Sequence, residues 1–170
     1  MTYTPPLRDL SFALNEIAGA GALRATAAFS SFDDETEAAV LDAAGRLARD
    51  VLAPLNRAGD QTGARFENGR VYAAPGFADA CRTFGAGGWN ALSADPHYGG
   101  QGLPKALDIA VFEMFNAANM AFALCPILTK AAIETLTALG TQAQKSLYLP
   151  KLMSGEIRVK EAEKKVQAVA

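Results

Sequence analysis

The chain has 170 residues, half of them hydrophobic, with a formal net charge of −2 and an isoelectric point near 5.4. This length and apolar content are enough to bury one sizeable core, so we expect one compact domain. The mildly acidic balance argues against nucleic acid or an anionic membrane surface as a partner, because both attract a basic surface. Cys81 and Cys125 lack CxxC or Cys/His spacing, so we expect no metal site and no disulfide framework, only two buried or partly buried thiols.

The N-terminal segment joins a proline-fixed start to a short amphipathic stretch and a Gly/Ala-rich connector, YTPPLRDLSFALNEIAGA. Leu10, Leu14 and Ile17 can share one helical face. Charged and polar residues interrupt this stretch, so we expect no signal peptide and a cytoplasmic protein. The longest uncharged run, between Glu113 and Lys130, is too short and too interrupted for a membrane span, and we interpret it as a buried helix pair.

The clearest element is a helix predicted over residues 36–56. Asp34 and Glu37 are placed to form its capping box, and Pro54 should kink or loosen its last turn. Its apolar residues recur at helical spacing: Val40, Leu41, Ala44, Leu47, Ala48, Val51, Leu52 and Leu55.

The dipeptide Asn68-Gly69, with apolar residues on both sides, predicts a tight hairpin, because Asn and Gly adopt the positive φ of its turn at little energetic cost. A further helix should begin near Pro75 and run to the glycines at 85, 87 and 88. After a loop over 88–104, Pro104 should restart a helix. Its core stripe is predicted to be Leu107, Ala110, Val111, Met114 and Phe115, with Lys105, Asp108 and Glu113 pointing elsewhere.

The segment 121–139 is apolar on most sides, which predicts a helix buried within the bundle. Together these elements predict an all-α fold, a bundle of four to five helices with little or no sheet.

Few residues in the chain are candidates for catalysis. His97, the only histidine, lies in a polar loop without a spaced nucleophile, and we expect it to be solvated. Glu113 and Glu134 could act as bases, but their polar helical neighbours favour exposed faces. Glycines 99, 100 and 102 allow sharp turns and close backbone approach, yet follow no strand as a dinucleotide fingerprint would. We therefore assign no catalytic residue and no metal ligand.

Two motifs carry a family resemblance. In GTQAQKSLYLPKLMSGE, Gly140 can end a helix in a left-handed conformation, and Thr141 with Gln144 can cap the next helix. This block resembles the G-T-x-x-Q-K-x-x-x-L-P-x-L-x-S-G-E end of the N-terminal helical domain of acyl-CoA dehydrogenases. The loop sequence GWNALSADPHYGGQGLP resembles an inter-helix loop of the same domain.

The resemblance implies domain limits of 1–35 for an N-terminal extension and 36–156 for the helical domain. The extension is similar to that of the subgroup that includes 3-methylmercaptopropionyl-CoA dehydrogenases. Family members perform FAD-dependent α,β-desaturation of an acyl-CoA thioester. Their base lies in a C-terminal domain, and most flavin contacts come from a middle β-domain.

Matched through Gly140, the family's acyl-chain wall corresponds to Ala123, Leu124, Ile127 and Ala131. These side chains suit burial of an acyl tail, although ordinary core packing is an equal alternative for each.

The last residues, 157–170, read IRVKEAEKKVQAVA, do not resemble the family's β-domain, and could form a short amphipathic helix. A frameshift, a disrupted gene or a deliberate truncation would each explain them. We therefore expect a part of an acyl-CoA dehydrogenase that is inactive alone and does not bind FAD tightly. The alternative is a non-catalytic helical interaction module that self-associates or binds a partner through its exposed inner face.

Overall fold

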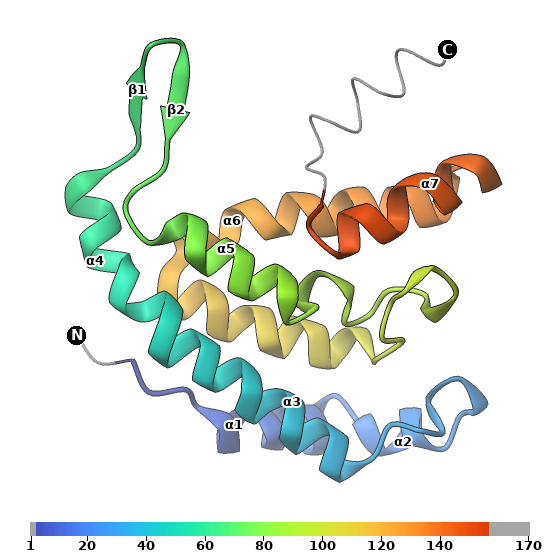
Figure 1. The fold of residues 1–170 in the computed structure, drawn as a ribbon. Helices are drawn as coiled ribbons and strands as arrows, with labels where there is room; N and C mark the ends of the chain where they lie inside the picture. The colour runs from blue at the N-terminus through green and yellow to red at the C-terminus, as the bar shows by residue number, and fades with distance from the viewer. Residues whose placement is uncertain (1–2, 157–170) are drawn as a thin grey trace. The chain divides into compact units, whose positions relative to one another are not determined.

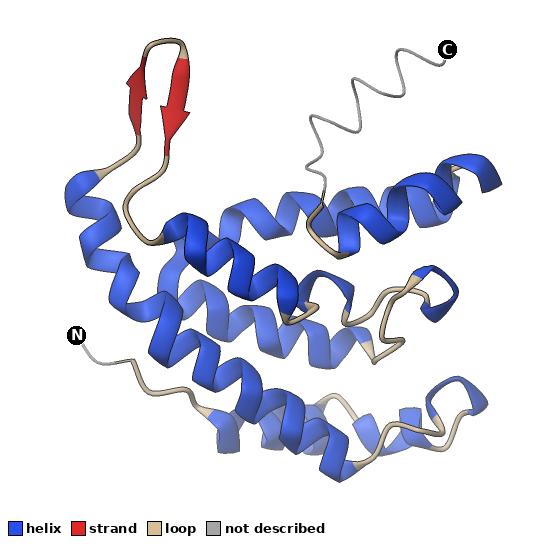
Figure 2. Ribbon diagram, in the orientation of Figure 1, coloured by secondary structure: helices blue, strands red, loops and turns tan. Residues whose placement is uncertain are grey.

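The computed structural model describes residues 3–156, and these are mainly helical with one small two-stranded sheet (Figures 1 and 2). The predicted all-α class is confirmed. The chain forms two compact units, residues 3–81 with 104–123 and residues 82–103 with 124–156. This division follows compactness, whereas the predicted limits at 35 and 156 follow sequence similarity and stay a prediction. The predicted tail helix at 157–170 lies outside the described residues.

The first unit begins with α1 (Leu7–Phe12), a π-helical turn at Ala13–Ile17 and α2 (Ala20–Arg24). Leu10 and Leu14 are buried as predicted, but Ile17 is 76% exposed. The π-helical turn explains the difference, because its wider winding rotates the following side chain away from the face that an α-helix would continue.

The predicted helix over 36–56 is confirmed and is longer than expected. It comprises α3 (Asp34–Leu47), a π-helical turn at Ala48–Leu52 and α4 (Ala53–Thr62). Pro54 lies in the first turn of α4, directly after the π-helical turn. The local rewinding accommodates the proline ring and its missing N–H, so the helix continues instead of ending. The buried stripe contains Leu41, Ala44, Leu47, Ala48 and Leu52.

The predicted capping box of α3 is wrong. The N-cap is Asp33, whose side chain accepts a hydrogen bond of 2.7 Å from the Thr36 backbone N–H. Glu37 does not reach back to the helix start, because its carboxylate is buried and binds side chains of the N-terminal segment. The N-cap is therefore one residue earlier than predicted, and Glu37 binds the N-terminal segment instead of capping the helix.

A hairpin follows α4, with β1 (Arg65–Glu67) antiparallel to β2 (Arg70–Tyr72), and it extends away from the helices next to it in the chain (Figure 1). Asn68 and Gly69 have φ of 52° and 76°. These values confirm the predicted turn and match type I′, which suits a two-residue hairpin loop.

Helix α5 (Phe77–Ala86) begins two residues after Pro75, close to the predicted start. Gly76 between them has φ of 85°, and a β-carbon there would lie 2.6 Å from a Leu55 methyl carbon. The turn that leads into α5 therefore requires glycine, both for its left-handed conformation and for its close approach to α4.

Helix α6 (Lys105–Leu139) spans the two units. In its first half the predicted stripe is confirmed, since Leu107, Ala110, Val111, Met114 and Phe115 are at most 6% exposed. The prediction that Asp108 points away from the core is wrong, because its side chain is 1% exposed. Lys105 Nζ lies 3.5 Å from Asp108 Oδ2, so a charge partner at the helix start compensates the buried carboxylate.

Asn119 interrupts α6, with φ of −159° and ψ of 89°. Its fully buried side chain accepts a hydrogen bond from the Phe122 N–H at 3.0 Å and donates one to the Leu52 carbonyl at 3.1 Å. The first bond joins an N-cap side chain to the third residue after it, so Asn119 caps the second half of α6. The second bond ties this point to the π-helical turn before Pro54.

Within the described residues, α6 alone has the length and hydropathy of a membrane-spanning helix. Half of its most apolar window is buried inside the protein. Core helices pass the same test, so this is only a weak indication of a span.

The second unit packs α7 (Gln142–Met153) with the loop after α5 and the second half of α6. Its core contains Ala91, Ile133, Tyr148, Leu149, Leu152 and Met153. The predicted capping box is confirmed, since Thr141 Oγ1 accepts from the Gln144 N–H and Gln144 Oε1 accepts from the Thr141 N–H.

The prediction of a left-handed Gly140 is wrong, because its φ is not positive. The Gly140 N–H donates to the Leu136 carbonyl at 2.8 Å, and a β-carbon on Gly140 would lie 2.6 Å from that same oxygen. Glycine is required at the end of α6 because the chain passes close to the Leu136 carbonyl, and not because residue 140 adopts a left-handed conformation.

Candidate functional site

The residues predicted to form an acyl-chain wall lie in the second half of α6. Ala123 is 1% exposed and belongs to the core, whereas Leu124 is 57% and Ile127 39% exposed, and Ala131 is also exposed. The prediction that the helix over 121–139 is buried is therefore wrong for much of its surface. The physical reason is that this half of α6 is apolar on more sides than the neighbouring elements of the chain can cover.

Leu128 joins the exposed set at 67% exposure. At 100° of helical rotation per residue, the four exposed residues fall within an arc of roughly 100°. We call Leu124, Ile127, Leu128 and Ala131 the apolar helix face. Sequence reasoning missed Leu128, although its spacing of four from Leu124 was the available signal. The assignment of these residues to an acyl-chain wall stays a prediction, because neither cavity described below includes them.

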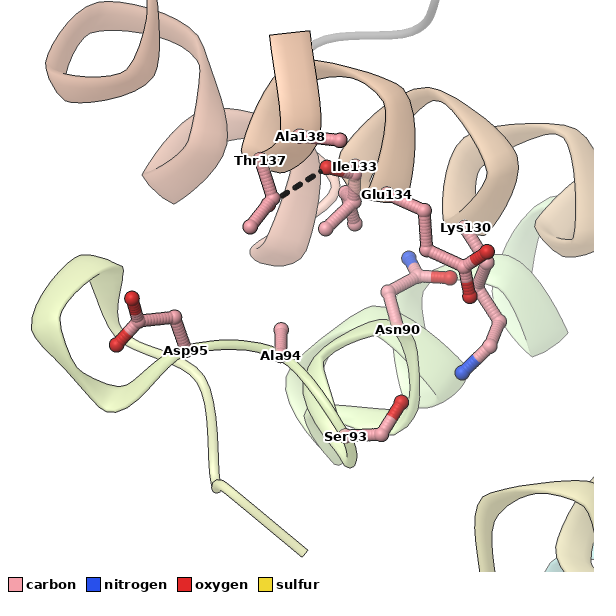
Figure 3. Close-up of a pocket in the computed structure, with 9 residues that line it drawn as sticks. All are labelled: Asn90, Ser93, Ala94, Asp95, Lys130, Ile133, Glu134, Thr137 and Ala138. Atoms are coloured by element: carbon pink, nitrogen blue, oxygen red, sulfur yellow. Dashed lines mark hydrogen bonds between the residues drawn. The ribbon is translucent and has the colours of Figure 1, made fainter. Parts of the chain in front are cut away.

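Another side of the same half-helix lines a cavity of about 220 Å³ together with the loop after α5 (Figure 3). Asn90 contributes a side-chain oxygen that has no partner among the described residues, in a residue that is 8% exposed. Figure 3 shows its amide facing the side chains of Glu134 and Lys130. The lining residues are Asn90, Ser93, Ala94, Asp95, Lys130, Ile133, Glu134, Thr137 and Ala138.

This cavity is smaller than the roughly 300–1,000 Å³ typical of pockets for drug-sized ligands and cofactors. A flavin dinucleotide therefore does not fit it. The polar lining brings a carboxylate and an ammonium group together across Asn90.

The glycine-rich loop at 99–102 is shaped by its own backbone. Gly99 and Gly102 have φ of 95° and 64°, as the predicted sharp turns require. A β-carbon on Gly100 would lie 2.1 Å from the Ala94 carbonyl oxygen, so the predicted close backbone approach is confirmed. Because the chain itself occupies that space, the glycine leaves no opening for a phosphate group. The Tyr98 hydroxyl and the Gln142 side chain tie this loop to α7 with distances of 3.1 and 3.3 Å.

The other candidate catalytic residues are solvent-facing, as predicted. His97 is exposed, and its ring meets the Tyr98 ring edge-on at a centroid distance of 4.8 Å. Glu113 and Glu134 are exposed. Burial, and to a lesser degree the negative charge of Glu113, raise the pKa of the Tyr3 hydroxyl above its ordinary value. Of these residues, Glu134 lines the 220 Å³ cavity, whereas His97 and Glu113 line neither of the two described cavities.

Both cysteines are exposed, so the prediction of buried or partly buried thiols is wrong. Cys81 lies in α5 and Cys125 in α6, on turns whose packing faces are formed by other residues. Among residues 3–156, no three histidine, cysteine or acidic side chains are grouped to hold a metal ion.

A polar cluster in the first unit was not anticipated from the sequence. The Glu37 carboxylate accepts hydrogen bonds from Ser11 at 3.0 Å, Asn15 at 2.8 Å and Arg24 at 2.6 Å. Arg24 also pairs with Asp34. These groups border an open cavity of about 450 Å³. Since the donors come from the N-terminal segment and Glu37 from α3, the cluster fastens that segment to the helix.

Comparison with known proteins identifies the family to which this helical architecture is similar. The family model described as "Acyl-CoA dehydrogenase, N-terminal domain" matches residues 34–156. The chain is 41% identical over 155 residues to 3-methylmercaptopropionyl-CoA dehydrogenase of Ruegeria pomeroyi, which covers 91% of this chain and 26% of that protein. It is 27% identical over 159 residues to butyryl-CoA dehydrogenase of Syntrophomonas wolfei, with the same coverage of 91% and 26%.

A shorter match, 38% identity over 74 residues, relates 43% of the chain to 18% of acyl-CoA dehydrogenase FadE26 of Mycobacterium tuberculosis. The chain spans about a quarter of the length of the first two relatives.

Proposed function

The chain belongs to the acyl-CoA dehydrogenase family, and from this premise we propose that it serves as the N-terminal helical part of an FAD-dependent enzyme that desaturates an acyl-CoA thioester in the cytoplasm. In this proposal its role is to contribute a wall against the acyl chain. The proposal extends to a short acyl or methylthio-acyl substrate, because the substrates named for two relatives are of that kind.

The observation that carries the proposal is the apolar helix face. Leu124 and Leu128 are more than half exposed, although the same helix buries the apolar stripe of its first half. Covering an apolar side chain of this size is worth about 1.5–3 kcal/mol when burial is complete. An acyl tail lying along this face would gain from its burial and would lose access to water.

Desaturation requires a base for the α-proton and an acceptor for the β-hydrogen, and a bound flavin would supply the redox chemistry. Neither the 220 Å³ cavity nor the glycine-rich loop fits that cofactor, so we derive no step through it. What the described residues can do is orient the acyl chain and exclude water beside the reacting carbons. We propose that this chain alone neither holds FAD tightly nor turns over substrate.

A chimeric enzyme tests the proposal. Residues 34–156 would replace the matching segment of the Ruegeria pomeroyi relative, and FAD retention and acceptor reduction would be measured with 3-methylmercaptopropionyl-CoA and butyryl-CoA. We expect an active, yellow chimera and an inactive, colourless isolated chain. A folded chimera without activity would contradict the proposed role, and an active isolated chain would contradict its dependence on other segments.

Variants of the active chimera test the apolar helix face. Leu124→Ala removes about 2 kcal/mol of potential apolar contact, so kcat/KM for the substrate should fall about thirtyfold. Leu139→Ala is the matched control, because Leu139 is 83% exposed on the same helix but lies eight residues, about two turns, beyond Ala131 at the end of the apolar helix face. Equal effects of the two substitutions would remove the reason for assigning the wall.

The second candidate function is a non-catalytic interaction module, and the same exposed leucines favour it, since contiguous apolar surface promotes association. It predicts a stable heterocomplex or oligomer of the isolated chain without flavin. A chimera that folds but lacks activity, together with such a complex, would move the assignment to this alternative.

A further inference from the structure

The hairpin formed by β1 and β2 is unusually bare for a folded element. All of its strand residues are exposed, and Phe66 and Val71 remain 73% and 71% exposed although they face each other across the pair. An isolated two-stranded hairpin is marginally stable in water, and the unpaired edges of its strands are templates for another strand. The element therefore has both an uncovered apolar pair and an available edge.

The register identifies which backbone groups are available. Glu67 and Arg70 close a two-residue type I′ turn, so they form the hydrogen-bonded pair next to it. Antiparallel pairs alternate between hydrogen-bonded and non-hydrogen-bonded positions, which makes Phe66 and Val71 a non-hydrogen-bonded pair. The N–H and C=O of Phe66 consequently point away from β2, toward the open edge of β1.

The side chains along that edge have a self-complementary order. Arg65 and Glu67 flank Phe66 and share one face of the strand, where their side chains form an ion pair of 3.1 Å. In an antiparallel pairing of β1 with itself centred on Phe66, each Arg65 would lie opposite a Glu67, and the two phenylalanines would lie opposite each other. Opposite charges and aromatic pairs both stabilise directly opposed positions.

We propose that the β1 edge binds the β1 edge of a second copy of this chain, giving a four-stranded antiparallel sheet in the order β2, β1, β1, β2. At its centre the two Phe66 residues exchange both N–H···O=C hydrogen bonds. Val71, Phe66 and their counterparts then form one apolar stripe, while Arg65 and Glu67 form charge pairs on the other face. This inference is independent of the proposed enzymatic role.

Two alternative pairings are weaker. Joining two β2 edges would place Arg70 opposite Tyr72 with no ion pair, and a parallel β1 pairing would place like charges side by side. Three-residue strands bury far less than the roughly 1,000 Å² of a stable interface. We therefore expect a weak, concentration-dependent dimer.

Charge substitutions test the pairing by sedimentation equilibrium of the purified chain over a concentration series. Glu67→Arg and Arg65→Glu each place like charges at both ends of the pairing, and each variant should self-associate about tenfold more weakly than the unmodified chain. Mixing the two single variants should restore association, because their charges are complementary. The double exchange of Arg65→Glu with Glu67→Arg should also restore it.

A pair of proline substitutions tests the edge itself. Phe66→Pro and Val71→Pro each remove an N–H that the hairpin ladder does not use, so both variants should keep the hairpin. Only Phe66→Pro removes the donor at the β1 edge, and it should weaken association about tenfold or more, whereas Val71→Pro should leave it unchanged. Circular dichroism would verify that helix content is retained.

A monomeric unmodified chain at every concentration would overturn the proposal. So would undiminished association of both charge variants, a mixture that associates no better than its components, or an equal effect of the two prolines.

Discussion

Asn119 joins two separate segments of the first unit, and its removal should be costly out of proportion to its size. It is fully buried within α6, at the one residue where the helix has non-helical dihedral angles. Its oxygen accepts from the Phe122 N–H and its nitrogen donates to the Leu52 carbonyl. Asn119→Ala would leave both backbone groups buried without these partners.

The expected magnitude follows from the two bonds. Loss of an N-cap side chain costs about 1 kcal/mol, and a buried carbonyl deprived of its donor costs about 2 kcal/mol. We expect the free energy of unfolding to fall by about 3 kcal/mol, a large part of the stability of a small domain. Asn119→Asp should cost more, because a carboxylate oxygen would then face the Leu52 carbonyl without a proton between them.

Urea unfolding followed by circular dichroism measures this change as a lower midpoint with an unchanged slope. Asn116→Ala is the matched control. Its side chain is half-buried in the same helix and donates to the Phe112 carbonyl at 2.7 Å, which is a bond within one turn. The control should change stability by less than about 1 kcal/mol, because alanine also favours the helix. A loss below about 1 kcal/mol for Asn119→Ala, or equal losses for both variants, would refute the reasoning.

Two further predictions concern the N-terminal half of the first unit. Arg24→Ala should lower the free energy of unfolding by about 3 kcal/mol in urea titrations, because Glu37, whose side chain is 3% exposed, would lose its charge partner. A smaller loss than for Arg49→Ala, which breaks an exposed pair, would contradict this. Hydrogen bonds from Thr36 lower the pKa of Asp33 below its ordinary value of 3.8, so its stabilising effect is complete above that value and is lost as the pH falls through the lowered pKa. Asp33→Asn should keep the cap, but the stability of the variant should lose this part of its dependence on pH below about pH 4. If the thermal unfolding midpoints of the variant and of the unmodified chain fall equally with pH in this range, the role of Asp33 is contradicted.

Local signals in the sequence predicted much of the fold. Periodic apolar residues identified α3 and the first half of α6, and the Asn68-Gly69 turn and the Thr141 capping box were both confirmed. Each of these features depends on residues within one or two turns of each other. A hydrogen bond or a φ value that neighbouring residues determine is visible in the sequence without knowledge of the tertiary structure.

The errors arise from contacts that local sequence propensity does not describe. Glu37 has the spacing of a capping residue, but donors 13 to 26 positions earlier hold its carboxylate instead. Asp108 has the composition of an exposed position, yet it is buried beside a lysine. Gly140 is required by a close approach to a carbonyl, which no propensity for left-handed turns describes.

The candidate site was predictable in type but not in extent. Matching α6 to the family gave Leu124, Ile127 and Ala131, which the structure shows on one exposed face, whereas Ala123 is in the core. An apolar residue on a helix can pack in the core or contact a ligand, and the residue type and spacing are the same in both cases. Only the exposed fraction separates these alternatives.

That separation is why the apolar helix face, and not the 220 Å³ cavity, carries the functional assignment. Single exposed leucines such as Leu139 are ordinary on protein surfaces. Leu124, Ile127 and Leu128 instead follow each other at spacings of three and four along one side of a helix whose first half buries every residue of its apolar stripe. A contiguous apolar surface of this kind favours a ligand or a partner that covers it. If Leu124→Ala and Leu139→Ala differ in the chimera, the covering group is the acyl chain. If they differ only in the association state of the isolated chain, the covering group is a second copy of this chain.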